Sequence, residues 1–258
     1  MSLNQPIRDW RDKRVWVIGA SSGIGAALAS ALLAQGARVA LSARSAPGLT
    51  QIAAAPGATA LVLPLDVTDA AAVAPALQLV VSAWGGIDLV VWCAGAHNPV
   101  RAWELDAADA RRLVDVNLNG VINGLPAVVR QLLQQNSGGI AIVSSVAGYG
   151  GLPTALVYGA TKAALINLTE TLYMDLAPRG IGVYLINPGF VKTPLTDKNT
   201  FKMPALISAD EAAREIIAGF ARGSFEIHFP QRFTLWLKLL RLLPYRWYFA
   251  LVHKGTGL

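Results

Sequence analysis

Residues 14–25 read RVWVIGASSGIG, and this stretch decides the fold that the rest of the chain follows. An apolar, β-branched run leads directly into a glycine-rich turn, and a helical pattern begins where the turn ends. Glycines in such a turn let backbone N–H groups approach a pyrophosphate at the positive end of the helix, where side chains would block the way. The spacing from Gly19 to Gly25 is Gly-x-x-x-Gly-x-Gly, and glycine turns also occur without a ligand, so the stretch alone leaves both interpretations open.

Short apolar runs alternate with longer helical patterns along the whole chain, which is typical of βαβ units and a parallel sheet. Strands are predicted at residues 14–19, 37–43, 60–66, 87–95, 139–145, 182–189 and 225–229. Helices are predicted at residues 25–35, 70–83, 107–135, 157–177 and 209–221, the last opened by a capping box from Ser208 to Glu211. The prediction is an α/β fold with a doubly wound, seven-stranded parallel sheet that carries helices on both faces.

Length and composition favour one domain. A chain of 258 residues with 53% hydrophobic content can build a large core without disulfides or metals. We expect a catalytic domain over residues 1–230 and a helical extension of it over residues 231–258. The single cysteine, Cys93, excludes an intramolecular disulfide and fits a reducing compartment, so a cytoplasmic location is expected. The first residues carry charges of both signs and no apolar run, so no signal or transit peptide is expected.

The net charge of +6 raises the possibility of nucleic-acid binding, but the basic residues are scattered through the first 220 residues. They are denser only in the tail, where large apolar side chains separate them, so no nucleic-acid partner is predicted. The three histidines, His97, His228 and His253, lie far apart in the sequence. Neither His-x-x-x-His nor paired-cysteine spacing occurs, so no metal site is predicted.

The end of the second predicted strand bears on cofactor choice. An acid there would bind a free ribose 2′-hydroxyl, but the sequence LSARS has none and carries Arg44 instead. A guanidinium at this place would pair with a 2′-phosphate, which favours NADP(H) over NAD(H); the alternative is an exposed loop arginine. Asp66 ends the third strand and either accepts a hydrogen bond from the adenine amino group or caps the helix that follows.

Tyr158 and Lys162 begin a predicted helix and share one face of it, because they are four residues apart. A tyrosine has an ordinary pKa near ~10, and a neighbouring ammonium is expected to lower that pKa by ~2–3 units, which suits proton transfer. A Tyr-x-x-x-Lys pair also arises by chance. Thirteen residues upstream of the tyrosine, a predicted strand ends in Ser144 and Ser145, followed by a glycine-containing loop.

Six motifs occur in order: GASSGIG, CAG at residues 93–95, VNLNG around Asn117, SSVAG, YGATK and INPGFVKTP. Together they resemble the short-chain dehydrogenase/reductase family of Rossmann-fold, NAD(P)-dependent oxidoreductases, over residues 12–229. The resemblance implies that Tyr158 is the general acid/base, that Lys162 lowers its pKa and holds the nicotinamide ribose, and that Ser145 bonds the substrate oxygen. Asn117 would hold a water in a proton relay through the lysine.

The resemblance also implies the cofactor contacts. The turn at Pro188 and Gly189, with Thr193, would cradle the nicotinamide end, and the backbone of Val191 would face the carboxamide. The predicted cofactor-binding residues are Gly19, Ser21, Ser22, Gly23, Ile24, Gly25, Arg44, Asp66, Val67, Ala94, Gly95, Tyr158, Lys162, Pro188, Gly189, Val191 and Thr193. Two positions depart from the family pattern: Ile18 replaces a threonine, and Trp92 stands in WCAG where NNAG is usual. An apolar contact between neighbouring strands is expected to replace a polar one there.

The sequence therefore predicts an NADP(H)-preferring alcohol dehydrogenase or carbonyl reductase. The alternative is a non-catalytic dinucleotide sensor or membrane-surface interaction protein. Residues 193–208 are expected to form a mobile lid, and Phe201, Met203 and Leu206 indicate an apolar small-molecule substrate. A homodimer or homotetramer is expected from the resemblance.

The tail after Pro230 is the unusual part of the chain. Residues 233–243 are apolar over about half the length needed to cross a bilayer, so they do not span one. Drawn as a helix, they place Thr234, Lys238 and Arg241 on one polar stripe, and Pro244 ends the helix before a second, aromatic-rich one. Two interpretations remain: a cap over the substrate cleft or a partner subunit, and an anchor on a membrane surface.

Overall fold

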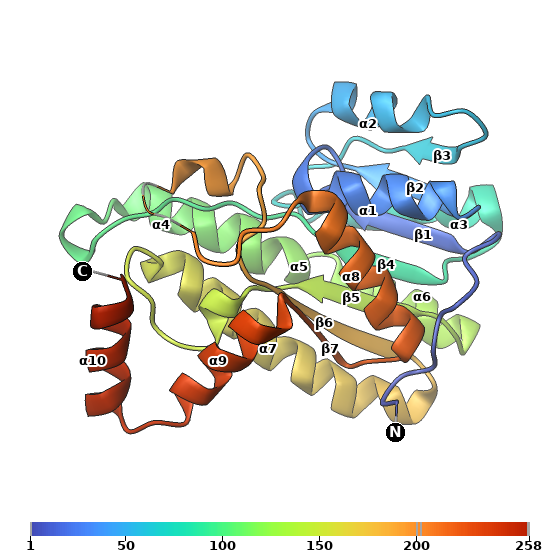
Figure 1. Cartoon of the computed structure of the whole chain (residues 1–258). Coiled ribbons are helices and arrows are strands. Elements are labelled where there is room, and N and C mark those ends of the chain that lie inside the picture. The colour runs from blue at the N-terminus through green and yellow to red at the C-terminus, as the bar shows by residue number, and fades with distance from the viewer. Residues whose placement is uncertain (1, 200, 202, 257–258) are drawn as a thin grey trace.

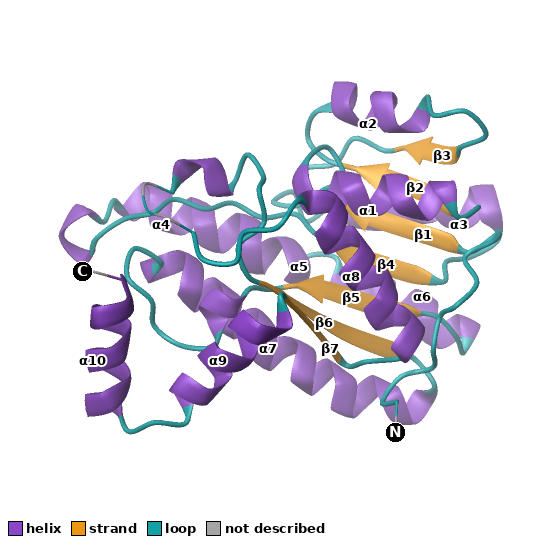
Figure 2. Cartoon of the chain, viewed as in Figure 1, coloured by secondary structure: helices purple, strands orange, loops and turns teal. Residues whose placement is uncertain are grey.

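The seven predicted strands form one sheet in the computed structural model, which describes residues 2–199, 201 and 203–256 (Figures 1 and 2). The strand order is β3-β2-β1-β4-β5-β6-β7, and every neighbouring pair is parallel. The chain leaves β3 at one edge and re-enters beside β1 as β4, so the order reverses between β1 and β4. In open α/β sheets, ligands bind outside the carboxyl ends of the strands at such a switch point. The strands are β1 Arg14–Ile18, β2 Arg38–Ser42, β3 Thr59–Val62, β4 Leu89–Trp92, β5 Gly139–Val143, β6 Gly182–Pro188 and β7 Glu226–Phe229.

Helices cover both faces of the sheet, as predicted. One core cluster joins the sheet to α1, α2 and α8, and a second joins it to α3, α6 and α7. The helices over the sheet are α1 Gly23–Ala34, α2 Ala46–Ala53, α3 Val73–Trp84, α4 Ala107–Val114, α5 Gly120–Ile122, α6 Leu125–Gln135, α7 Leu156–Leu176 and α8 Ala209–Arg222. The predicted capping box opens α8, with the Ser208 hydroxyl accepting from the Glu211 amide at 3.1 Å.

Side-chain alternation along β1 explains the two cores. Val15 and Val17 pack on the α1 face, whereas Trp16 and Ile18 pack on the α3 face, because successive side chains of a strand point to opposite sides. Ile18 is the register partner of Trp92 on β4, and both are buried in the same cluster. The two positions that depart from the family pattern thus lie side by side on neighbouring strands, where their apolar side chains join one core.

The predicted continuous helix over residues 107–135 is wrong. The segment divides into α4, a π-helical turn at Asp115–Asn119, the short α5, and α6, which begins just after Gly124. A Cβ on Gly124 would lie 2.6 Å from the Trp92 ring, so the chain approaches the sheet too closely here for a larger residue. The sequence prediction also missed α2, which is short and carries Pro47 in its first turn.

The tail forms two helices separated at Pro244, α9 Gln231–Arg241 and α10 Tyr245–Thr256. Figure 1 shows both at the end of the molecule toward which the strand arrows point, with α10 standing away from the sheet. Among the described residues, no helix combines the length and the apolarity that crossing a bilayer requires.

Candidate functional site

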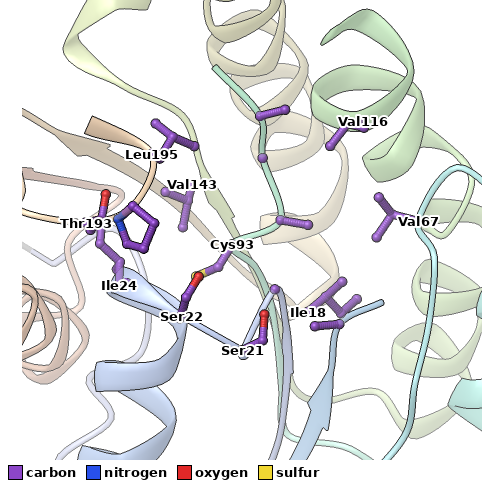
Figure 3. A pocket seen from close by; sticks show the side chains of 18 of the residues that line it. Ile18, Ser21, Ser22, Ile24, Val67, Cys93, Val116, Val143, Thr193 and Leu195 are labelled. Atoms are coloured by element: carbon purple, nitrogen blue, oxygen red, sulfur yellow. The ribbon is translucent and has the colours of Figure 1, made fainter. Parts of the chain in front are cut away.

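A cleft of about 340 Å³ opens at the carboxyl ends of the strands, where the order reverses. Figure 3 shows Ser21, Ser22 and Ile24 on one side of it, with Thr193 nearby and Val67 and Val116 on the other side. All the predicted cofactor-binding residues line this cleft, as do Ser145, Tyr158 and Lys162. The predicted set, dispersed over 175 positions from Gly19 to Thr193, is therefore gathered at one place in the fold.

The glycine turn leaves room for a ligand at the start of α1. Gly19 has a φ of +94°, and a Cβ on Gly25 would lie only 2.1 Å from the Gly19 carbonyl oxygen, so side chains are excluded at both positions. Ser22 occupies the N-cap of α1 without a side-chain hydrogen bond to the helix, so the first backbone N–H groups are not capped from within. This arrangement fits the pyrophosphate of a dinucleotide, which binds such groups at a helix N-terminus.

Lys162 projects from the first turns of α7 into the base of the cleft. Its Nζ donates a hydrogen bond to the Val143 carbonyl at 2.9 Å and lies 5.6 Å from the centre of the Tyr158 ring. The side chain is only 4% exposed, and burial lowers the pKa of Lys162 to about 8. The ammonium is therefore poised to exchange a proton near neutral pH.

The predicted depression of the Tyr158 pKa by Lys162 is wrong for the protein without ligand. The protein around Tyr158 raises the pKa of its phenol, because removal from water penalises the phenolate, and the neighbouring Ser145 hydroxyl opposes this rise. Lys162 directs its ammonium to a backbone carbonyl rather than to the phenol oxygen. Tyr158 is consequently held protonated, which suits a group that donates a proton to a carbonyl oxygen.

The two adjacent serines have different surroundings. The Ser144 hydroxyl donates to the Lys162 carbonyl at 2.7 Å and fastens β5 to α7. The Ser145 hydroxyl accepts from the Ala147 amide at 3.1 Å and lies beside Tyr158. Ser145 is therefore the serine whose hydroxyl faces the Tyr158 phenol.

Asn117 lies behind the cleft rather than on its wall, in the π-helical turn between α4 and α5. Its side chain is fully buried and binds both backbone groups of Ala96, accepting from the N–H at 2.7 Å and donating to the carbonyl at 3.0 Å. It also donates to the Thr161 hydroxyl at 3.1 Å. π-Helical turns are frequent at functional sites, and this one fixes the loop after β4 against α7.

Arg44 is exposed at the edge of the cleft, next to Ser45. None of the ion pairs found in the described part of the chain includes it. The Asp66 carboxylate uses Oδ1 to accept from both the backbone amide and the hydroxyl of Thr68, at 2.9 and 2.8 Å. These bonds, aided by the charge of Arg44, lower the pKa of Asp66 below its usual range.

His97 belongs to the site, although nothing in the sequence marks it beyond a lone histidine in a loop. Its ring lies 4.5 Å from the Tyr158 ring, centre to centre, and its Nε2 meets the Asn199 side chain at 3.1 Å. The Lys198 ammonium donates to the His97 carbonyl at 3.2 Å. Burial lowers the pKa of His97, which favours the neutral ring at pH 7, and this ring connects Tyr158 to the segment predicted to form a lid.

Two backbone hydrogen bonds hold the ends of the predicted lid segment together. The Lys192 amide donates to the Ile207 carbonyl at 2.8 Å, and the Ile207 amide donates to the Phe190 carbonyl at 3.1 Å. Phe201 packs edge-on against Phe190 at 5.6 Å, and Asn199 contacts the sulfur of Met203. Residues 200 and 202 of this segment lie outside the described residues.

The fold and the cleft define a dinucleotide-binding α/β protein with a Ser-Tyr-Lys site. The sequence model of the short chain dehydrogenases matches residues 13–203, and the chain belongs to that family. An uncharacterized oxidoreductase of Myxococcus xanthus is 37% identical over 231 residues, covering 88% of this chain and 91% of its own.

Solved structures agree on the fold. A short-chain dehydrogenase/reductase of Burkholderia phymatum in complex with NAD has a TM-score of 0.83 at 26% identity, over 90% of this chain and 94% of that one. ElxO with NADP bound has a TM-score of 0.75 at 24% identity, over 84% of this chain and 97% of that one. The protein is therefore an oxidoreductase with a Rossmann-type sheet.

Proposed function

We propose that this short-chain dehydrogenase interconverts an alcohol and a carbonyl on a small apolar substrate and prefers NADP(H) to NAD(H). In this proposal Tyr158 is the general acid/base, and Ser145 and Lys162 are its catalytic partners. Asn117 holds in place the proton relay that runs through Lys162. Residues 1–230 form the catalytic domain and residues 231–258 extend it. The expected assembly is a cytoplasmic homodimer or homotetramer, which light scattering after size-exclusion chromatography tests.

The observation that carries the proposal is the meeting of Tyr158, the Ser145 hydroxyl and the buried Lys162 ammonium in one cleft. The bound dinucleotide supplies the hydride in reduction and accepts it in oxidation. Tyr158 gives its proton to the substrate oxygen in reduction and takes it back in oxidation, while Ser145 orients that oxygen. Lys162 loses and regains a proton close to neutral pH, which suits it to restore the proton of Tyr158.

The preference for NADP(H) is supported by the exposed Arg44 and by the lack of an acid in residues 41–45. A charge-assisted hydrogen bond to the 2′-phosphate is worth roughly 1.5–3 kcal/mol, or at least about tenfold in affinity. Arg44→Asp is expected to reverse the preference in calorimetric titrations with both dinucleotides, whereas Arg8→Asp, an exposed arginine remote from the cleft, leaves it unchanged. Equal affinity of the unmodified protein for the two dinucleotides contradicts the assignment.

An apolar substrate is supported by the surfaces around the cleft. Val116 and Leu195 line it, and Phe190, which follows the Pro-Gly turn, contacts Phe201 of the lid and Phe233 of α9 at 5.6 and 5.7 Å between ring centres. None of these five side chains can form a hydrogen bond with a polar substrate. In this proposal the substrate oxygen is bonded by Tyr158 and Ser145 instead.

NADPH oxidation across a panel of ketones, aldehydes, lipid-derived carbonyls and steroids tests the activity. Tyr158→Phe is expected to lower turnover at least a hundredfold, because proton transfer by a positioned side chain contributes about 10²–10⁴-fold. Tyr173→Phe, on the same helix but bonded to the Leu3 carbonyl, is the matched control and should retain turnover. Near-normal turnover in Tyr158→Phe would refute the assignment, and dinucleotide binding with no turnover on any carbonyl would favour the sensor.

A further inference from the structure

We propose that α9 and α10 form a docking surface for an anionic lipid membrane. Six large apolar side chains on these two helices and at the end of α9 are each 57–81% exposed: Trp236, Leu239, Leu242, Tyr245, Trp247 and Phe249. The other large apolar side chains that exceed half exposure in the described chain are Leu3, Leu79, Trp103 and Met174, which lie on four separate segments. The six residues, called the tail surface below, are the one place where such side chains gather among the described residues.

The tail surface results from the way α9 is attached. Thr234 is fully buried and its hydroxyl meets His228 Nδ1 at 2.6 Å, while Lys238 pairs with the Glu226 carboxylate. The predicted polar stripe therefore turns toward the protein at Thr234 and Lys238. The apolar side of the helix is left facing outward.

Buried contacts hold this orientation in place. Tyr149 and Asn187 both donate to Glu226 Oε1, at 2.6 and 2.8 Å, so the carboxylate that receives Lys238 is fixed by two further elements. Tyr248 is buried and donates to the Gly151 carbonyl at 2.8 Å, which fastens α10 to the loop before α7. The exposed apolar side chains are thus presented by anchored helices.

The charge of the tail is complementary to an anionic surface. No aspartate or glutamate follows Glu226 in the sequence. The exposed cations that accompany the tail surface are Arg232, Arg241, Arg246 and Lys254. Tryptophan and tyrosine are favoured at the boundary between headgroups and hydrocarbon, and cations near them attract anionic lipids.

The same charge pattern argues against a second copy of the chain as the occupant. In a two-fold symmetric dimer the tail surface would meet itself. Arginines and a lysine would then face like charges, with no acid on either tail to compensate, and such juxtaposition is unfavourable. Anionic lipid supplies the charge that the chain itself lacks.

Co-sedimentation of the full-length protein with vesicles tests the proposal. The probes are vesicles of phosphatidylcholine with 30% phosphatidylglycerol and vesicles of pure phosphatidylcholine, each at low and high salt. We expect binding to the anionic vesicles that weakens at least tenfold at high salt. Failure to bind anionic vesicles at low salt overturns the proposal, and since no turnover is measured, this outcome is independent of the proposed enzyme activity.

Variants locate the contact. Trp236→Ser combined with Trp247→Ser is expected to weaken vesicle binding at least tenfold, whereas Leu79→Ser, an equally exposed apolar residue on α3, leaves it unchanged. Arg246→Glu combined with Lys254→Glu alters only exposed side chains and should also abolish binding, which keeps the test decisive if the tryptophan variant misfolds. Unchanged binding in the charge variant, or a dimer that the tryptophan variant dissociates without any vesicle binding, contradicts a lipid surface.

Discussion

Replacing Lys162 with methionine is expected to stabilise the ligand-free protein while it removes turnover. Burial lowers the pKa of this lysine from its ordinary 10.5 to about 8. The gap between those values corresponds to about 3 kcal/mol of unfolding free energy at pH 7, since each pKa unit is worth about 1.4 kcal/mol. Methionine has a similar length and no charge, but it leaves the Val143 carbonyl without its donor, which costs about 1 kcal/mol. The net expectation is a gain of about 1–3 kcal/mol.

The effect depends on pH with a defined sign. Below pH 8 the lysine is protonated in both the folded and the unfolded protein, so the folded state carries the full cost of the buried charge. Between pH 8 and pH 10.5 the unfolded chain binds more protons than the folded one, so the stability of the natural protein rises with pH. The advantage of the methionine variant should therefore be largest at pH 7 and should shrink toward pH 10.

Urea unfolding without dinucleotide, followed by tryptophan fluorescence at pH 7 and pH 10, measures this. The unfolding free energies of the variant and the natural protein are compared at the same pH. The contribution of the tyrosines that also titrate in this range is then nearly the same in both proteins and largely cancels. Lys13→Met, an exposed lysine remote from the cleft, is the control and should change the stability by no more than about 0.5 kcal/mol at either pH. A Lys162→Met protein that is less stable at pH 7, or whose advantage is the same at both values, refutes the reasoning.

Two further predictions rest on close contacts. Gly25→Ala places a Cβ 2.1 Å from the Gly19 carbonyl oxygen, so it should displace the turn and weaken dinucleotide binding at least tenfold in calorimetry, whereas Gly151→Ala, where a Cβ meets nothing within 4 Å, should not. Glu226→Gln should lower the unfolding free energy by about 1–3 kcal/mol at pH 7, because it leaves Lys238 without its partner. Hydrogen bonds hold the pKa of Glu226 below its ordinary 4.5, so this stabilisation is present above pH 4.5 and is lost as the pH falls through the folded-state pKa. A difference between the two proteins that persists unchanged to pH 3 would contradict this.

Local sequence signals were sufficient for the sheet. Each strand is an apolar run bounded by turn residues, and such signals survive whatever packs on the strand. The break before α6 also had a local signal, which the prediction of one continuous helix passed over: Pro126 lies in the first turn of α6, and a proline inside a helical pattern ends the helix before it. The short α2 was missed because its eight residues include Pro47 and Gly48, which taken alone indicate a turn.

For the site as well, the sequence shows what depends on local spacing but not what depends on the fold. Tyr158 and Lys162 are visible in the sequence because their spacing on one helix fixes their common direction. The direction of the Tyr158 pKa was not predictable, because it is set by how much protein surrounds the phenol and by where Lys162 directs its ammonium. His97 reaches Tyr158 only through the fold, so no spacing rule could have selected it.

The orientation of α9 follows from the strand that precedes it. Along β7, Ile227 and Phe229 are buried in the core shared with α8, whereas the alternate residues Glu226 and His228 are polar and point to the other face. A helix that covers this face must satisfy a carboxylate and an imidazole, and Lys238 and Thr234 do so. Because Lys238 and Thr234 of α9 bond to the strand, the surface that α9 turns outward is mainly apolar. The polarity of the last strand, together with the composition of the helix, therefore explains why the apolar side of α9 faces outward.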